Sequence, residues 1–403
     1  MRRVVITGVG VVSPVGVGAE AFWSALTSRR TGLTVAPPEM AAGPARVVGA
    51  VRDFSGASYL KNERQARVLN RSFELLVGAG ALAAADAGLA ATPVPPHRLG
   101  VIVGMGPIDQ YTPDLRAAVQ HATSADGRVD LAAFVEAARQ LYPLRRLRLL
   151  PNVGPSILSI EHHAMGPSLT LVGGHTSGLQ AVADALAMIR DGRVDAVLCG
   201  AADSRLASLD LRLFAQLCPL SPSSDPDTAC RPFDRRRNGV VPGEGAAVFL
   251  LEAEDSARAR RADAYAEIVE CAFAAPTEGG CAESMRQVMQ GSGERAPDVV
   301  VAHGEGGVQA DRLEAAALDL LAPRCVTSLQ PAIGHTMSAC GALNLAAACL
   351  ILSDGQVPPI RSLEAPEMHL PFAMHDVRGD FSTVIVNAID PDSAASSALL
   401  ARP

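Results

Sequence analysis

The chain has 403 residues, of which 48% are hydrophobic and 4% aromatic, and its formal net charge is -7. A chain of this length can bury a large core, built here mainly from Ala, Val and Leu. The mild acidity argues against a broad nucleic-acid surface, and no run approaches the roughly 20 apolar residues that a membrane span needs.

The N-terminus predicts a first β-strand over Val4–Ile6. Two arginines precede this apolar run, as in a secretion signal, but Gly8, Gly10, Pro14 and Gly16 interrupt it. We therefore expect a cytoplasmic protein. The eight cysteines show neither C-x-x-C pairs nor metal-like spacing, so they predict buried small apolar side chains and no metal site.

Strand-like apolar runs then alternate with Ala- and Leu-rich helical stretches. We expect helices at Ala19–Thr27, Gln65–Ala87, Gly178–Arg190, Ala310–Leu321 and Ala339–Leu352. After the first strand, further strands are expected at Leu99–Val103, Leu169–Val172, Ala196–Cys199, Val248–Glu252, Ala266–Phe273, Val299–Ala302 and Thr383–Val386.

This alternation indicates an α/β architecture with buried, largely parallel strands. The order of elements is similar in the two parts of the chain, which predicts two pseudo-equivalent halves, 1–255 and 256–403. Residues 111–150 are less regular and predict an insertion or cap. This segment could line a pocket or face a partner, or it could be a solvated amphipathic helix.

Four segments carry a family resemblance, in the same order and over nearly the whole chain. They are R-V-V-I-T-G-V-G-V-V-S-P-V-G from Arg3, R-P-F-D-R-R-R-N-G-V-V-P-G-E-G-A from Arg231, A-H-G-E-G-G-V-Q-A-D from Ala302 with Glu314 following, and I-G-H-T-M-S-A-C-G from Ile333. Together they resemble the β-ketoacyl-ACP synthases. The resemblance implies a thiolase fold with five αβαβα layers.

Two histidines in these segments suit the chemistry of that family. His303 and His335 each lie beside glycines, which let the backbone come close to a thioester. A decarboxylating Claisen condensation needs a nucleophile, an oxyanion hole and two imidazoles that stabilise the enolate. The resemblance implies that both histidines occupy active-site positions.

The nucleophile position departs from the family. Where the family has a strand, a Cys and a helix, this chain reads L-V-G-G-H-T-S-G, so that His175 stands in the Cys position. A helix N-terminus lowers the pKa of a Cys, whereas an acyl-imidazole hydrolyses readily and stores an acyl group poorly.

Three further departures accompany that substitution. Gln330 replaces the family's Lys five residues before the second His, and Glu305 and Gly307 replace its T-x-T pair. We assign the family's C-terminal G-F-G-G-x-N loop, which supplies an oxyanion-hole amide, to Asp376–Phe381, where Arg378 would crowd the backbone. These changes together indicate relaxed catalytic constraint.

The resemblance therefore implies a chain length factor, or ketosynthase β subunit, of a type II polyketide or aryl-polyene-type system. Such a subunit forms a heterodimer with an active Cys-containing ketosynthase paralogue, here through the strand near Leu169–Val172, and needs no cofactor. The acyl chain grows into a tunnel at the interface. We expect Ile108, Tyr111 and Leu115 to line it, with ordinary core packing as the alternative.

An acyl carrier protein is acidic and should dock on a basic face. Lys61, Arg64, Arg67 and Arg71 lie at roughly helical spacing and could form one, and the arginines of Leu144–Leu150 are a second candidate. A solvated face explains either set equally well.

Two rival functions remain open at this stage. His175, His303 and His335 could decarboxylate malonyl-ACP as a priming step, without acyl transfer. Alternatively, the chain could be a self-sufficient enzyme with another acyl-transfer or ester-forming reaction. Turnover by the isolated subunit would favour an enzyme, and activity only with a paralogue would favour a partner subunit.

Overall fold

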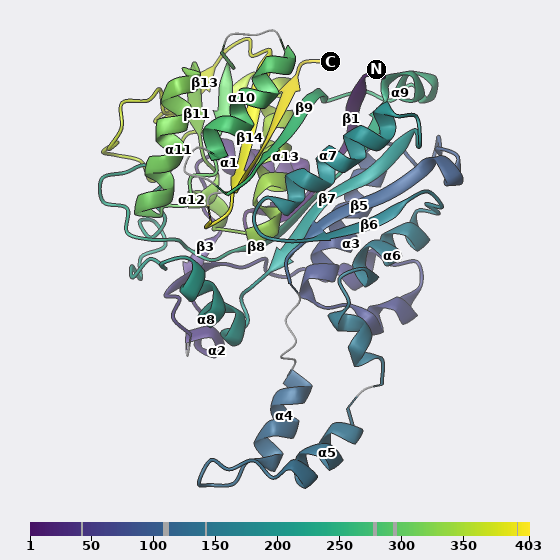
Figure 1. The fold of residues 1–403 in the computed structure, drawn as a ribbon, viewed down its shortest axis with the longest axis vertical. Helices are drawn as coiled ribbons and strands as arrows, with labels where there is room; N and C mark the ends of the chain where they lie inside the picture. Colours follow the sequence, from purple (N-terminus) through teal and green to yellow (C-terminus); the bar gives the residue numbers. More distant parts are fainter. Residues whose placement is uncertain (42, 108–112, 142, 277–279, 293–295, 393) are drawn as a thin grey trace.

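The computed structural model describes residues 1–403 except 42, 108–112, 142, 277–279, 293–295 and 393 (Figure 1). Its strands are β1 (Val4–Ser13), β2 (Gly16–Val17), β3 (Leu33–Val35), β4 (Val47–Gly49), β5 (Leu99–Met105), β6 (Ser168–Val172), β7 (Ala196–Ser204), β8 (Glu244–Ala253), β9 (Ala266–Ala274), β10 (Val299–Val301), β11 (Cys325–Thr327), β12 (Gln356–Val357), β13 (Val377–Arg378), β14 (Thr383–Ile389) and β15 (Ala395–Ala401).

The α-helices are α1 (Ala19–Thr27), α2 (Pro38–Ala41), α3 (Arg71–Asp86), α4 (Pro113–Ala122), α5 (Leu131–Arg139), α6 (Val153–Glu161), α7 (Ser177–Arg190), α8 (Ser208–Leu217), α9 (Glu254–Arg260), α10 (Gly280–Ser292), α11 (Val308–Leu321), α12 (Gln330–Ile333) and α13 (Cys340–Asp354). Two 3₁₀ helices matter below, η2 (Glu63–Val68) and η4 (Pro143–Leu149).

The main sheet consists of two sets of strands with the same topology. Its order is β11-β10-β14-β15-β9-β1-β8-β7-β5-β6. In one set β5 pairs in parallel with β6 and β7, while β7–β8 and β8–β1 are antiparallel. In the other, β10 pairs in parallel with β11 and β14, while β14–β15 and β15–β9 are antiparallel. The expected pseudo-equivalent halves are therefore present, joined by a short antiparallel pairing of β1 with β9. The exact boundary near residue 255 stays a prediction.

Helices cover both sets of strands and fill the space between them (Figure 1). Helices α7 and α13 contact strands of both sets and share one apolar cluster with them. Helices α3 and α6 pack on the outer face of the β5–β8 set, and α10 and α11 on the outer face of the other. This gives the five αβαβα layers of the thiolase fold, as the sequence predicted.

Helix α13 is a core helix. Contrary to the expectation from the sequence, the segment Met337–Asp354 is long and apolar enough to cross a membrane, but 89% of it is buried inside the fold. The helix itself carries apolar residues on all of its sides, which is typical of a helix enclosed between two sheets.

One expected helix is shorter than predicted. The segment expected as a continuous helix over Gln65–Ala87 is η2 followed by α3, with a break at Leu69 and Asn70. The Asn70 side chain accepts the backbone N–H of Phe73 at 2.9 Å and so begins a new helix. Because Asn is strongly preferred as an N-cap, this local bond outweighs the apolar periodicity on which the prediction relied.

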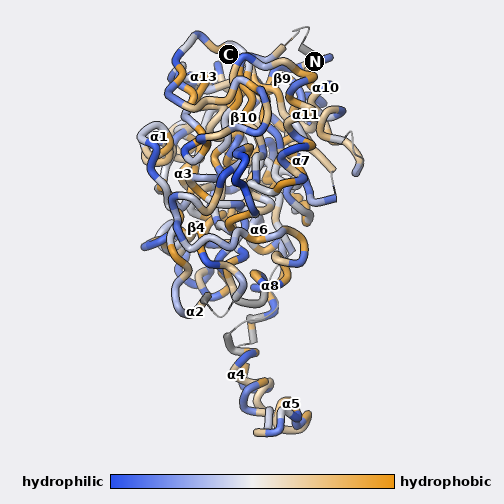
Figure 2. Tube along the Cα trace, turned by 90° about the vertical axis from the view of Figure 1, so that its left-hand side faces the viewer, coloured by the Kyte–Doolittle hydropathy of each residue, from blue (hydrophilic) through white to orange (hydrophobic). Residues whose placement is uncertain are grey.

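Part of the expected insertion forms a helical arm. Helices α4 and α5 pack against each other and extend away from the body of the molecule in both views (Figures 1 and 2). Leu131 and Val135 on α5 are 73% and 50% exposed. Ile108 and Tyr111 lie outside the described residues, and Leu115 is half-buried on α4.

Candidate functional site

Three histidines from distant parts of the chain lie together in the middle of the fold. His175 precedes α7, His303 follows β10, and His335 lies in the turn before α13. All three are 1% exposed. The ring of His335 lies with its centroid 4.2 Å from that of His175 and 5.1 Å from that of His303. The start of α7 thus comes next to the start of α13.

A glycine allows this close approach of the two central helices. A Cβ atom at Gly178, in the first turn of α7, would lie 2.7 Å from the carbonyl oxygen of Ser338 and 3.1 Å from the Cβ of Ala201. No side chain fits at the first distance without a shift of the backbone. The close packing of the two helices therefore explains why a glycine stands at position 178, three residues after the nucleophile position.

Hydrogen bonds fix the backbone of His303 and the ring of His335. The Glu314 carboxylate accepts the N–H groups of His303 and Gly304, each at 2.8 Å. The N–H of Met337 donates to Nδ1 of His335 at 3.3 Å, so the neutral His335 ring carries its hydrogen on Nε2. That nitrogen lies 3.3 Å from Nε2 of His303.

Glu305 adds a buried carboxylate to this cluster. Its Oε2 lies 3.7 Å from Nε2 of both His303 and His335. Burial disfavours the imidazolium of His303, but the adjacent Glu305 outweighs burial and raises the His303 pKa. Burial tends to raise the Glu305 pKa, but His303 outweighs it and lowers that pKa. The cluster therefore favours an ion pair between Glu305 and His303.

The other two imidazoles stay neutral. Burial, followed by the neighbouring His303, lowers the pKa of His175. Burial, followed by His175 and His303, moves the pKa of His335 well below its ordinary value. A positive charge on His303 thus disfavours protonation of the two neighbouring rings.

Asp390, which was not predicted from the sequence, lies beside the turn that precedes helix α7. Its carboxylate accepts the backbone N–H of His175 through Oδ1 and the Thr176 hydroxyl through Oδ2, the latter at 2.7 Å. The carbonyl of Ile389 lies 2.8 Å from Nδ1 of His175. A Cβ at Gly174 would lie 2.0 Å from Oδ1 of Asp390, so a larger residue there would displace that carboxylate.

The loop that contacts His175 is not the one assigned from the sequence, and that assignment was wrong. Asp376–Phe381 contains the short strand β13, which pairs with β12. The loop at His175 instead joins β14 to β15 and begins at Asp390. The error arose because the last strand, β15, was not expected. Its sequence A-S-S-A-L-L-A lacks the β-branched and aromatic residues that mark strands.

Arg71 is half-buried, and its guanidinium is engaged by neighbouring groups of the same chain. Its guanidinium donates to Glu244 at 2.9 Å and to the carbonyl of Val51 at 2.6 Å. Glu244, from the G-E-G-A end of the second motif, also accepts from Ser204 at 2.6 Å. The motif thus joins β8 to the start of α3, and Arg71 does not belong to an exposed docking set.

Of the remaining candidate docking residues, Lys61, Arg64 and Arg67 are exposed. Lys61, Arg64 and Arg67 lie on or next to η2, and Lys61 Nζ donates to the carbonyl of Glu161 at 2.6 Å. Nε of Arg148, on η4, donates to the carbonyl of Arg67 at 3.0 Å. The two basic segments that the sequence offered separately are therefore neighbours on the surface.

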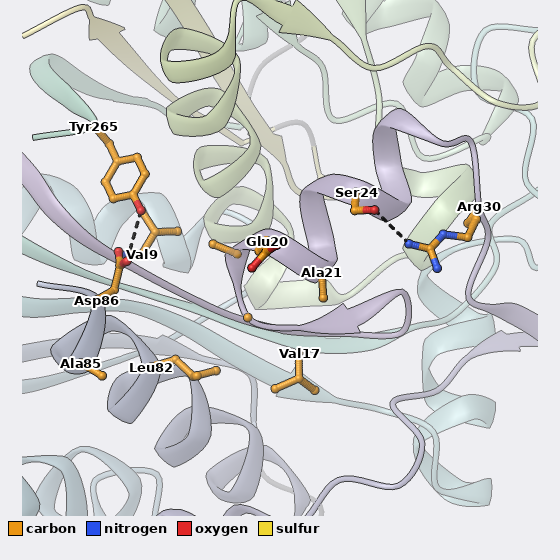
Figure 3. A pocket seen from close by; sticks show the side chains of 12 residues that line it. Val9, Val17, Glu20, Ala21, Ser24, Arg30, Leu82, Ala85, Asp86 and Tyr265 are labelled. Atoms are coloured by element: carbon orange, nitrogen blue, oxygen red, sulfur yellow. Dashed lines mark hydrogen bonds between the residues drawn. The ribbon is translucent and has the colours of Figure 1, made fainter.

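A pocket of about 660 Å³ on the surface shares no residue with the histidine cluster (Figure 3). It lies between α1 and α3, and Tyr265 and Val9 also line it. The Tyr265 hydroxyl donates to Asp86 at 3.2 Å, and Arg30 donates to Ser24 at 3.3 Å. None of the residues that line this pocket belongs to the candidate site.

Comparison with protein-family models matches residues 1–257 to the N-terminal domain of β-ketoacyl synthases and residues 264–364 to their C-terminal domain. The α subunit of the tetracenomycin polyketide synthase ketoacyl synthase from Streptomyces glaucescens is 34% identical over 425 residues, covering 100% of this chain and 97% of that protein.

Solved structures give the same fold. The ishigamide ketosynthase/chain length factor is 27% identical, with a TM-score of 0.85 over 100% of this chain and 99% of that one. A type II polyketide synthase acyl-carrier protein in complex with its ketosynthase bound to a hexaketide contains a chain that is 22% identical, with a TM-score of 0.85 over 100% and 99%. The second comparison supports the fold alone.

Proposed function

The chain belongs to the β-ketoacyl synthase family, among ketosynthase and chain-length-factor-like subunits of type II polyketide systems, and from that premise we propose that it is a non-condensing subunit. It pairs with an active, Cys-containing ketosynthase and shapes the tunnel into which that partner's acyl chain grows. One observation carries the proposal: His175 stands at the nucleophile position with its backbone N–H already bonded to the Asp390 carboxylate.

Two features of this site disfavour condensation, the imidazole at the nucleophile position and the Asp390 carboxylate beside it. An acyl group on the imidazole of His175 is a short-lived species, because acyl-imidazoles hydrolyse readily. The backbone N–H of His175, just before α7, would otherwise be available to stabilise an oxyanion. Here Asp390 accepts that N–H, and its negative charge opposes a second anion at the same place.

The same electrostatic argument weighs against the decarboxylase alternative. Loss of CO₂ from a malonyl thioester leaves an enolate, which needs donors or positive charge near its oxygen. Glu305 is buried beside both His303 and His335, and its carboxylate pairs with the only imidazole of the three whose pKa is raised. A second anion in this space would face that carboxylate.

An exposed sheet edge supports the heterodimer. Strand β6 is the last strand at one end of the main sheet, and Leu169 and Val172 on it are 38% and 52% exposed. Nearby apolar side chains on and after α6 are also exposed, Ile160 by 59% and Met165 by 73%. An open edge with apolar neighbours is a ready surface for pairing with another strand, and homologous subunits pair through equivalent surfaces.

Lys61, Arg64 and Arg67, together with the adjacent η4, give the best candidate face for an acidic acyl carrier protein. In one structural neighbour an acyl-carrier protein is in complex with its ketosynthase. We extend this contact to the present chain as part of the proposal, and we place the heterodimer in the cytoplasm, consistent with eight free cysteines. No cofactor is invoked.

Two measurements test the proposal. Co-expression with a Cys-containing ketosynthase paralogue from the same organism should give a 1:1 complex on size exclusion, with product formed only by the pair. Incubation of the isolated chain with malonyl-ACP should leave the malonyl group intact by mass spectrometry. Rapid formation of acetyl-ACP by the isolated chain, abolished by His303→Ala, would establish the decarboxylase instead.

A further inference from the structure

Four ligand-type side chains converge in the histidine cluster. His175, His303, Glu305 and His335 each direct one nitrogen or oxygen into a common space, and these four atoms all lie within 4.8 Å of one another. The side chains come from three separate turns of the chain, and all four residues are at most 8% exposed. We propose that this cluster binds a single divalent cation of the Zn²⁺ type.

The distances fit a metal ion of that size. Nε2 of His303, Nε2 of His335 and Oε2 of Glu305 form a triangle with sides of 3.3, 3.7 and 3.7 Å. The point equidistant from its corners lies about 2.1 Å from each atom, which matches the Zn–N and Zn–O bond lengths of about 2.0–2.2 Å found in proteins.

His175 is prepared to be the fourth ligand. Its Nδ1 lies 2.8 Å from the Ile389 carbonyl, which can only accept, so Nδ1 carries the hydrogen and Nε2 keeps a free lone pair. A backbone carbonyl on the second ring nitrogen is the usual outer partner of a metal-bound histidine. The substitution that removes a nucleophile thus adds an imidazole to a set that already contains two.

The charges of the site give a second reason for a cation. Glu305 is buried, and its ion pair with His303 spans 3.7 Å, which is longer than a hydrogen bond and leaves room for a bound cation. Buried carboxylates are stable when they are paired or bind a metal. Three imidazoles with one carboxylate favour Zn²⁺ and similar transition metals over Mg²⁺ or Ca²⁺, which prefer oxygen ligands.

Metal binding has two identifiable costs. His303 must give up the proton that its ion pair with Glu305 favours. His335 can bind through Nε2 only if its hydrogen moves to Nδ1, which now accepts the N–H of Met337. That contact is 3.3 Å long and therefore weak, and a metal–nitrogen bond replaces it. The proposal concerns a structural ion in a non-condensing subunit, and it holds equally if the chain proves to be an enzyme.

Equilibrium metal binding by the purified full chain tests this site. After removal of metals with a chelator, Zn²⁺ is titrated back and bound metal is measured by elemental analysis, with Co²⁺ as a spectroscopic probe. We expect one equivalent per chain and the intense visible bands of tetrahedral Co²⁺. Glu305→Gln and His175→Ala should each lower the affinity for Zn²⁺ beyond the about 10–100-fold that outer partners contribute.

His369→Ala is the matched control, because His369 is exposed and lies outside the cluster, and it should bind Zn²⁺ like the wild type. Thermal unfolding of the metal-free variants shows whether they are folded, and Zn²⁺ should raise the midpoint only where all four ligands are present. Binding of less than one equivalent at micromolar Zn²⁺, or unchanged affinity in the folded Glu305→Gln variant, would overturn the proposal.

Discussion

The carboxylate of Asp390 accepts the backbone N–H of His175 at the start of helix α7. The same carboxylate accepts the hydroxyl of Thr176, while the preceding carbonyl of Ile389 bonds to the His175 ring. One loop therefore satisfies both the backbone N–H and the ring of the residue at the nucleophile position. The loss of catalysis that we propose is a property of this loop as well as of the substituted residue.

Replacing the histidine alone should not create a synthase. In His175→Cys the Asp390 carboxylate still occupies the N–H and stands beside the thiol, which opposes both a thiolate and an oxyanion. We expect no acyl adduct by intact-mass measurement after incubation with acyl-ACP. His175→Cys combined with Asp390→Ala should form the adduct about 10²-fold faster, the usual effect of one oxyanion-hole donor. Rapid acylation of the single variant would contradict this account.

Gly174 and Asp390 should be strongly coupled. A Cβ at position 174 would lie 2.0 Å from the Asp390 carboxylate, so Gly174→Ala should lower the free energy of unfolding by about 2–3 kcal/mol. In the Asp390→Ala background the same change should cost at least about 1 kcal/mol less, because the clashing atom is gone. Urea unfolding of the four proteins of this cycle measures the coupling. Additive effects would show that some other contact excludes a side chain at Gly174.

A charge on the edge strand should separate the subunits. Leu169→Arg places a guanidinium on β6, and the affinity for the partner ketosynthase should fall by about 2–4 kcal/mol, or roughly 30- to 1000-fold. Leu320→Arg is the control, since Leu320 is 80% exposed on α11, a helix that packs on the other set of strands. Light scattering or calorimetric titration distinguishes the variants. Equal binding by both would place the interface elsewhere.

Arg71 and Arg67 should differ sharply although both are arginines of one basic segment. Arg71→Ala leaves the buried Glu244 without its cation, and we expect a loss of about 3 kcal/mol in the free energy of unfolding. Arg67→Ala should change stability by less than about 0.5 kcal/mol, because its side chain is exposed. If Arg67 belongs to a docking face, this variant should instead weaken binding of the carrier protein, measured by titration of the heterodimer.

His162 should make the fold sensitive to mild acid. Burial, together with the nearby Lys61, lowers its pKa to about 4 from the ordinary 6.5. Between pH 4 and pH 6.5 the unfolded chain therefore binds more protons than the folded one. The contribution of His162 to the free energy of unfolding is fully present above pH 6.5 and is lost as the pH falls toward 4, by up to about 3 kcal/mol. Denaturation midpoints of wild type and His162→Gln at pH 7 and pH 5 measure this contribution.

The Gln variant should show a shallower pH dependence, whereas His163→Gln should behave like the wild type, because the side chain of His163 is exposed. An identical pH dependence in wild type and His162→Gln would assign the acid sensitivity to other groups.

The sequence alone determined the family, the layered fold and the positions of His175, His303 and His335. These follow from local patterns, since each histidine lies beside glycines at the end of a strand or the start of a helix. Strand and helix order, read from apolar runs, suggested the two halves, and the resemblance to the family supplied the five layers.

Only the tertiary structure showed which other residues surround the three histidines. Asp390 reaches His175 from the loop between β14 and β15, and Glu305 lies between His303 and His335. The edge position of β6 likewise depends on the order of strands across the sheet rather than along the chain. Hydrogen bonds and charge contacts between residues this far apart in sequence leave no local periodicity, so they become visible only when the two halves of the fold meet.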